Sequence, residues 1–401
     1  MSDDFLTYIS QSECVVNGVD PYDVWSGNIQ SDRYYPFEHL ELKTESRNRP
    51  IQGNVPWFYT YFLPFSSYGT LHSQWIVWEL FMIPLFLIVV GVCYSFGRRL
   101  SNAGMFDIRP GLFVAAAALS VGFAFPLRFI GNNLFIAAAA LALMLRCLVR
   151  GRDILAGMCL AFAVTKPQCC FLFAIPLMFA KKWRTMVVAG FVCLTASTVA
   201  SCLIGKPIVD LILEVPKLRP VHVSAALIPA SLADWLIQAG VGEGLIRSSS
   251  MAIGVALCVL LTWLVRKSED WLVRVLPAIM CASIWTYMDS CDRCIFFVAQ
   301  TLFACRFLST KSPKERFGMI FMMVVVFCTC IQPILYCGGL ISAIGNNFGI
   351  DNLAQICAAI VNPIGTVAML LFVGGVVTFC VLEHRALRRM EKNCILHCDG
   401  N

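Results

Sequence analysis

The sequence predicts an all-α fold: a polytopic transmembrane bundle of about ten to eleven helices, with outer-side loops that carry amphipathic helices. Its composition is the first reason. Of 401 residues, 58% are hydrophobic and 14% are charged, whereas soluble domains are about 45–50% apolar and about 25% charged. The second reason is that the apolar residues form long runs, with the lysines and arginines between them. Together these features exclude a cytosolic enzyme, a disordered protein and a nucleic-acid-binding protein.

Eleven apolar stretches are long enough to cross, or nearly cross, a bilayer. A crossing takes about 20 helical residues for a hydrocarbon core of about 30 Å. Because lipid offers the backbone no hydrogen-bond partners, each stretch is expected to be a helix. The stretches are residues 75–96, 111–127, 132–145, 153–165, 168–180, 185–204, 249–265, 272–289, 292–305, 317–336 and 354–382.

The same pattern divides the chain into five parts. An outer-side loop (1–74) precedes a transmembrane core with short helical hairpins (75–204). A second outer-side loop (205–248) leads to the C-terminal transmembrane helices (249–383) and a cytoplasmic tail (384–401).

The positions of the cations predict the orientation. If residues 1–74 lie outside and the spans alternate, 20 of the 31 lysines and arginines fall in the inner connections and the tail. This agrees with the positive-inside rule and places the C-terminus in the cytoplasm. The net charge of +6 therefore reflects the topology of the chain. The expected partners include membrane lipids and no nucleic acid. An outer N-terminus also predicts a further helix encoded before Met1.

Two outer segments are rich in apolar or aromatic residues. Residues 54–65 carry six aromatic side chains, and residues 207–216 form a second apolar element. The first segment is interpreted either as an interfacial aromatic belt or as an amphipathic helix on the outer leaflet that roofs a cavity. The two interpretations are compatible.

The most informative spacing surrounds Lys166. Arg152 and Lys181 enclose 28 residues, with Lys166 and Pro167 near the middle. This length suits two short helices of about 13 residues, each about 20 Å long. Their outer turn, with Lys166 in it, then lies below the membrane surface. The preceding pair of helices places Arg128 in a similar turn.

Two shallow cations have two interpretations. Their side chains either extend to the lipid headgroups, or line a polar cavity that binds an anion at the level of lipid phosphates. Arg128 offers bidentate phosphate contacts and Lys166 a point charge, and their presence in consecutive hairpins favours the cavity. Asn132 lies in the same turn as Arg128. In the second outer loop Lys217, Arg219 and His222 either contact the acceptor or form a solvated loop.

No metal or cofactor is expected. Most of the 20 cysteines lie in apolar runs, where a thiol behaves as a small hydrophobic group. Cys291 and Cys294 form a Cys-x-x-Cys pair without four evident ligands. Asp20, before Pro21, is expected to be a turn residue.

The order of several motifs resembles glycosyltransferase family 87, which belongs to the GT-C superfamily of integral membrane glycosyltransferases. The resemblance covers residues 1–205, and beyond them extends only to hydropathy. A helix usual before the Asp-Phe pair is absent, and the Tyr-Pro-Pro element is reduced to Asn-Val-Pro. The motifs are Asp4-Phe5, Gly18-Val-Asp-Pro-Tyr22, Asn54-Val-Pro56, Gly131-Asn-Asn133, Arg150-Gly-Arg152, Ala156-Gly157, Lys166-Pro167 and Lys182-Trp-Arg184.

The resemblance implies a GT-C-like fold and a hexosyltransferase. It would move a hexose, often mannose, from a polyprenyl-phosphate donor to a lipid or glycan acceptor of the cell envelope. The active site would face outward. Asp4 matches the position of the catalytic base in this superfamily, and its neighbour Asp3 is the alternative. Arg128 and Lys166 would stabilise the departing phosphate.

Two other functions fit a polytopic chain. A transporter or flippase of a lipid-linked or small solute would also need a wet cavity, but no internal repeat is evident. A scaffold-like homologue without activity would explain the altered motifs.

Overall fold

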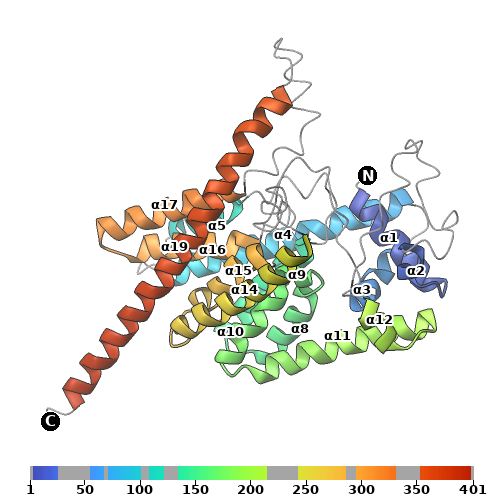
Figure 1. The fold of residues 1–401 in the computed structure, drawn as a ribbon, viewed down its shortest axis with the longest axis horizontal. Coiled ribbons are helices and arrows are strands. Elements are labelled where there is room, and N and C mark those ends of the chain that lie inside the picture. The colour runs from blue at the N-terminus through green and yellow to red at the C-terminus, as the bar shows by residue number, and fades with distance from the viewer. Residues whose placement is uncertain are drawn as a thin grey trace.

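The computed structural model describes residues 3–25, 55–66, 71–100, 108–121, 134–214, 243–285, 295–330 and 353–398. Within these ranges every regular element is a helix (Figure 1). The predicted all-α class is confirmed for this part of the chain.

Each of the eleven apolar stretches contains helix in the structure. The elements up to residue 179 are α1 (Asp3–Val16), α2 (Pro21–Trp25), α3 (Pro56–Ser66), α4 (Leu71–Leu100), α5 (Arg109–Leu119), α7 (Leu134–Val149), α8 (Asp153–Ala163), α9 (Pro167–Cys170), the 3₁₀ turn η3 (Phe171–Phe173) and α10 (Ala174–Phe179). The later elements are α11 (Trp183–Ile204), α12 (Ile208–Glu214), α14 (Glu243–Val265), α15 (Trp271–Trp285), α16 (Phe297–Ser309), α17 (Pro313–Thr329) and α19 (Leu353–Cys398).

The chain carries membrane helices of two lengths. Among the described residues, His72–Arg99, Trp183–Ile204 and Val367–Glu391 are long and apolar enough to cross a bilayer. Shorter apolar segments of 10–17 residues include Phe135–Val149, Asp153–Ala163 and Ser249–Val265, the last being part of α14, and each is less than the about 20 residues that a full crossing takes. Three of the described helices thus meet the length and hydropathy of a complete crossing, and the number of ten to eleven spans stays a prediction.

The outer surface of the bundle is apolar. Val187 and Phe191 on α11 are both 69% exposed, and Phe317 on α17 is 72% exposed. Large apolar side chains exposed to this degree on neighbouring helix turns suit contact with lipid rather than water.

The break predicted at Lys166 and Pro167, between two short helical segments, is present, and its depth in the membrane stays a prediction. The first arm of this hairpin, α8, has 11 residues. Its second arm is a broken helix in which α9, η3 and α10 follow one another from Pro167 to Phe179. The break between the arms falls at Pro167, which disfavours helical backbone at the residue before it.

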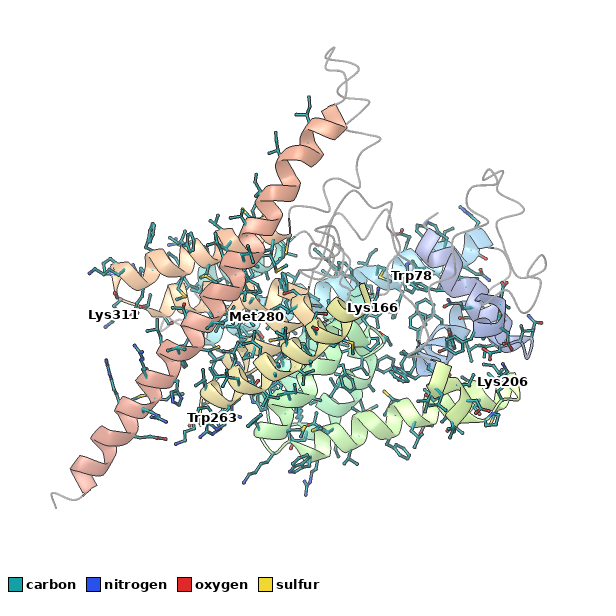
Figure 2. All side chains as sticks on the ribbon, viewed as in Figure 1. Trp78, Lys166, Lys206, Trp263, Met280 and Lys311 are labelled. Carbon is teal, nitrogen blue, oxygen red and sulfur yellow. The ribbon has the colours of Figure 1, made fainter. Side chains whose placement is uncertain are left out.

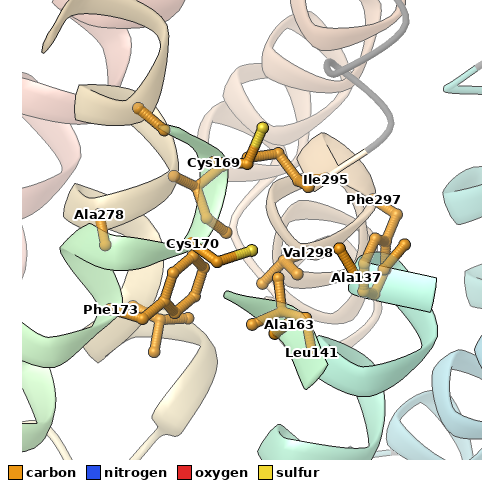
Figure 3. Close-up of a cluster of buried hydrophobic side chains, with 14 of the residues drawn as sticks. Ala137, Leu141, Ala163, Cys169, Cys170, Phe173, Ala278, Ile295, Phe297 and Val298 are labelled. Carbon is orange, nitrogen blue, oxygen red and sulfur yellow. The ribbon is translucent and has the colours of Figure 1, made fainter. Parts of the chain in front are cut away.

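The core is centred on α7, which contacts α4, α8 and α15. Ala137 and Leu141 on α7 are fully buried. Figure 3 shows both in one cluster with Cys170 of α9 and Val298 of α16, and Ala278 of α15 lies on the opposite side of this cluster. A helix that is apolar on all sides is typical of such a buried position.

Segments predicted to share the inner side are in contact at one end of the bundle. The Arg306 guanidinium lies 3.1 Å from the Glu383 carboxylate, and Lys267 Nζ lies 2.5 Å from Glu391 Oε1. These pairs join the ends of α14 and α16 to α19. The alternation of the spans is therefore consistent with the predicted order, and the side of the membrane that each end faces stays a prediction.

The last helix extends beyond its expected end. The sequence predicts a span over 354–382 and a tail from 384, but α19 continues without a break to Cys398. Its 46 residues correspond to about 69 Å, more than twice the hydrocarbon core. The first part of the predicted tail is thus a continuation of the helix.

Candidate active site

The turn between α8 and α9 holds a buried cation. Lys166 has φ −108° and ψ 77°, outside helical values, and Pro167 follows as the first residue of α9. The Lys166 carbonyl accepts hydrogen bonds from the amides of Cys169 (3.0 Å) and Cys170 (3.1 Å). These bonds fix the turn at the start of the broken second arm.

Lys166 is buried, next to apolar side chains of the same turn. Lys166 is only 7% exposed, and Cys169 and Cys170 are fully buried. Figure 3 shows the two cysteines beside Ile295, in a cluster that Ala163 joins from α8. A charge in such low-dielectric surroundings interacts with a nearby anion far more strongly than it would in water. Lys166 therefore has the burial expected of an anion-binding cation, whereas a side chain extended to the headgroups would be exposed.

The first turn of α1 contains Asp3 and Asp4. Helical spacing places position 4 on the same face as Tyr8, Gln11 and Val15, which lie four, seven and eleven residues later. These three residues are at most 2% exposed. Positions 3 and 4 are neighbours in this first turn, about 100° apart around the helix.

An aromatic cluster joins α1 to α3. The Tyr8 ring lies 5.1 Å from both Phe58 and Phe62, and the Phe62 ring lies 5.1 Å from Trp78 of α4. All four residues are at most 2% exposed. Within residues 54–65, Phe58 and Phe62 therefore pack inside the protein and do not form an interfacial belt.

Helix α3 also contacts α11 and, through one ring pair, the arm that leads to Lys166. Thr60 donates a hydrogen bond of 2.7 Å to the Ala196 carbonyl of α11. The Tyr61 ring lies 4.5 Å from the Phe162 ring, and Phe162 precedes Lys166 by four residues. Helix α3 consequently contacts both the helix that carries Asp4 and the arm that leads to Lys166.

A further charged cluster, which the sequence analysis did not identify, fixes the corner between α1 and α2. Lys206 Nζ lies 2.5 Å from the Asp20 carboxylate and 2.5 Å from that of Asp23. Asp20 also accepts a hydrogen bond of 2.8 Å from the Tyr22 amide, which confirms its expected role in a turn. Figure 2 shows Lys206 at the end of α11, beside this corner.

The cluster changes the chemistry of Lys206. Partial burial lowers its pKa, but the hydrogen bonds and charges of Asp20 and Asp23 outweigh this effect and raise the pKa above its ordinary value. Lys206 therefore stays protonated, as an ion-pair partner. The signal in the sequence was the pair of aspartates around Pro21, but nothing local linked it to a lysine more than 180 residues away.

The remaining candidates lie outside the described residues. They are Arg128, Asn132, Lys217, Arg219 and His222. Their roles stay predictions, as does their proximity to Lys166.

The chain matches the model of a known protein family. The model of glycosyltransferase family 87 matches residues 55–330, which is 276 of 401 residues. The match includes Lys166 and Lys206, extends past the expected limit at residue 205, and does not include Asp3 or Asp4. No curated protein and no solved structure matches the chain significantly.

Proposed function

Because the chain belongs to glycosyltransferase family 87, we propose that it transfers a hexose, most simply mannose, from a polyprenyl-phosphate donor to a lipid or glycan acceptor of the cell envelope. The reaction takes place at the outer face of the membrane. Family membership favours transfer of a sugar over transport of a solute.

The observation that carries the choice of donor is the buried cation at the break between α8 and α9. Lys166 is 7% exposed and lies at the end of a helix too short for a full crossing. These observations support a site in which the ammonium group lies at the depth of the apolar layer and meets a lipid-linked phosphate. A soluble nucleotide sugar would have to leave water to reach this group.

The chemistry needs one base and one or more cations. The bond between the anomeric carbon and the phosphate oxygen breaks, and the phosphate leaves with the electron pair. The acceptor hydroxyl attacks the anomeric carbon as this becomes oxocarbenium-like, and its proton passes to the Asp4 carboxylate. Lys166, with Arg128 as its predicted partner, stabilises the charge that develops on the phosphate.

The packing of α3 supports this assignment of roles. Tyr8, one turn after Asp4, packs on Phe58 of α3, and Phe162, one turn before Lys166, packs on Tyr61 of α3. The two groups are therefore carried by elements that share one rigid neighbour. Catalysis benefits when the base and the phosphate-binding cation are held in a fixed relation.

The donor is tested with purified protein in proteoliposomes that contain an envelope lipid extract as acceptor. Labelled polyprenyl-phosphate mannose and a labelled nucleotide-linked mannose are supplied in parallel. The proposal predicts transfer from the lipid-linked donor alone. Transfer from the nucleotide sugar, or none from any polyprenyl-phosphate hexose, would contradict it.

A further inference from the structure

The ion cluster formed by Asp20, Asp23 and Lys206 joins the N-terminal helices to the end of α11. Helix α11 ends at Gly205, which has a left-handed backbone with φ +77°. Lys206 follows it, and Ser201 donates a hydrogen bond of 2.5 Å to the Lys206 carbonyl. The backbone that carries the ammonium group is therefore fixed to α11.

The corner on the other side of the cluster is also fixed. Gly18 has φ +71°, and a Cβ there would lie 3.5 Å from the Leu203 carbonyl oxygen, so the turn after α1 runs against the last turn of α11. Tyr22 packs edge-on against Tyr59 of α3, with ring centroids 5.9 Å apart. The end of α1 is thus set by contacts to α11 and α3.

The charge of Lys206 is what holds this corner against α11. Asp20 is 2% exposed at its side chain and Asp23 31%, so two carboxylates share one cation in a partly buried site. Without Lys206 the buried Asp20 carboxylate would lose the cation that compensates it, and the two carboxylates would repel each other. The corner would then move away from α11 toward water.

We infer that Lys206 is a positioning residue, which fixes the far end of α1 and thereby the place of Asp4 in the transfer reaction. This inference rests on the proposed function. Residues 4 and 16 of a helix are about 18 Å apart, so a tilt of about 5° at the corner moves position 4 by about 1.5 Å. A displacement of about 1 Å can lower a rate about 10²-fold.

The fold does not depend on this cluster. Tyr8 and the aromatic residues of α3 and α4 hold α1 on the bundle through apolar contacts, which tolerate small shifts. The Lys206 side chain is 39% exposed, so the loss of its charge is expected to affect this corner more than the packing of the bundle. A variant without the ammonium group is therefore expected to fold.

The test compares Lys206→Met with Lys206→Arg and with a matched control, Lys182→Met. Lys182 lies at the other end of α11 and forms a similar ion pair with Asp153 at 2.8 Å. Three quantities are measured for each variant: kcat and donor KM for sugar transfer, the temperature of unfolding, and hydrogen exchange of the amides in residues 8–24.

Lys206→Met should lower kcat about 10²-fold with an unchanged donor KM, and should speed exchange in residues 8–24. Lys206→Arg should keep most of the wild-type kcat and most of the protection from exchange. Lys182→Met should change neither kcat nor exchange. Unchanged exchange in Lys206→Met, or faster exchange with wild-type kcat, would overturn the inference. If the wild type itself transfers no sugar, the proposed function fails and the catalytic role with it, while the exchange result still shows whether Lys206 fixes α1.

Discussion

At the scale of single residues, the proposed function depends on Lys166, a cation in a buried position. Lys166 is 7% exposed, among residues such as Cys169 and Cys170 that are fully buried. Keeping a lysine in such surroundings costs stability, because burial removes the hydration of the ammonium group. A functional role explains why the chain keeps this charge.

Replacing Lys166 separates function from stability. Lys166→Met keeps the length of the side chain and removes its charge, so sugar transfer should fall about 10²–10³-fold because the departing phosphate loses an electrostatic partner. The temperature of unfolding is measured in parallel, so that a loss of transfer can be distinguished from a loss of folding. Lys311→Met, which removes an exposed cation from the turn before α17, is the control and should change neither quantity. Wild-type transfer by Lys166→Met would remove this residue from the mechanism.

Some residues of the candidate site could be predicted from the sequence, and others could not. The spacing of Arg152, Lys166 and Lys181 was sufficient to place Lys166 in a turn between short helices, because charges mark where apolar helices end. The ion cluster of Lys206 was not predictable, because its carboxylates lie 183 and 186 residues earlier in the chain. Asp4 was found only through its resemblance to a family motif.

At the scale of elements, close helix packing fixes the hairpin that carries Lys166. A Cβ at Gly157 of α8 would lie 2.6 Å from the Thr185 carbonyl oxygen and 2.7 Å from Val188 Cβ, both on α11. Distances this short require the backbones to move apart. The glycine therefore permits α8 and α11 to approach each other at this point.

Gly157→Ala is expected to destabilise the protein by about 1–3 kcal/mol, because the added methyl group overpacks the interface. Gly190→Ala on α11 provides the control, since a Cβ there meets nothing within 4 Å and alanine favours helix. Thermal unfolding in detergent compares the two variants. An equal effect of both substitutions would show that the contact between α8 and α11 is not close in solution.

Helix boundaries show where sequence reasoning stops. The break at Pro167 was predictable, because proline disfavours helix at the residue before it. The end of α19 was not, because hydropathy marks only the apolar part of a helix. Its polar continuation is stabilised by tertiary contacts of Glu383 and Glu391 and by His384, whose ring nitrogen lies 3.0 Å from the Leu264 carbonyl oxygen.

At the scale of the whole molecule, ion pairs are found at two ends of the helix bundle. Arg306, Lys267 and α19 meet at one end, and Lys206 meets the N-terminal helices at the other. The sequence alone predicted which connections lie at the same end of the bundle, because the cations cluster at alternate connections. It could not show which of the shorter helices complete a crossing, since this depends on how each one packs.

Sidedness is tested by cysteine labelling in intact cells, with Cys202→Ser as the parent because Cys202 is the exposed cysteine among those that the structure describes. Asp210→Cys on α12 and Lys311→Cys before α17 both replace exposed residues. A membrane-impermeant maleimide should label position 210 in intact cells and position 311 only after permeabilisation. The reverse pattern would place the proposed site in the cytoplasm.

The central claim is that Asp4 is the base in transfer from a polyprenyl-phosphate sugar. Its most direct test is the rate of transfer from labelled polyprenyl-phosphate mannose in proteoliposomes, for wild type, Asp4→Asn and Asp3→Asn. The account predicts that Asp4→Asn loses at least about 10²-fold in rate while folded and inserted, and that Asp3→Asn stays near the wild type. Transfer by Asp4→Asn at the wild-type rate would contradict the account, and loss confined to Asp3→Asn would move the base to its neighbour.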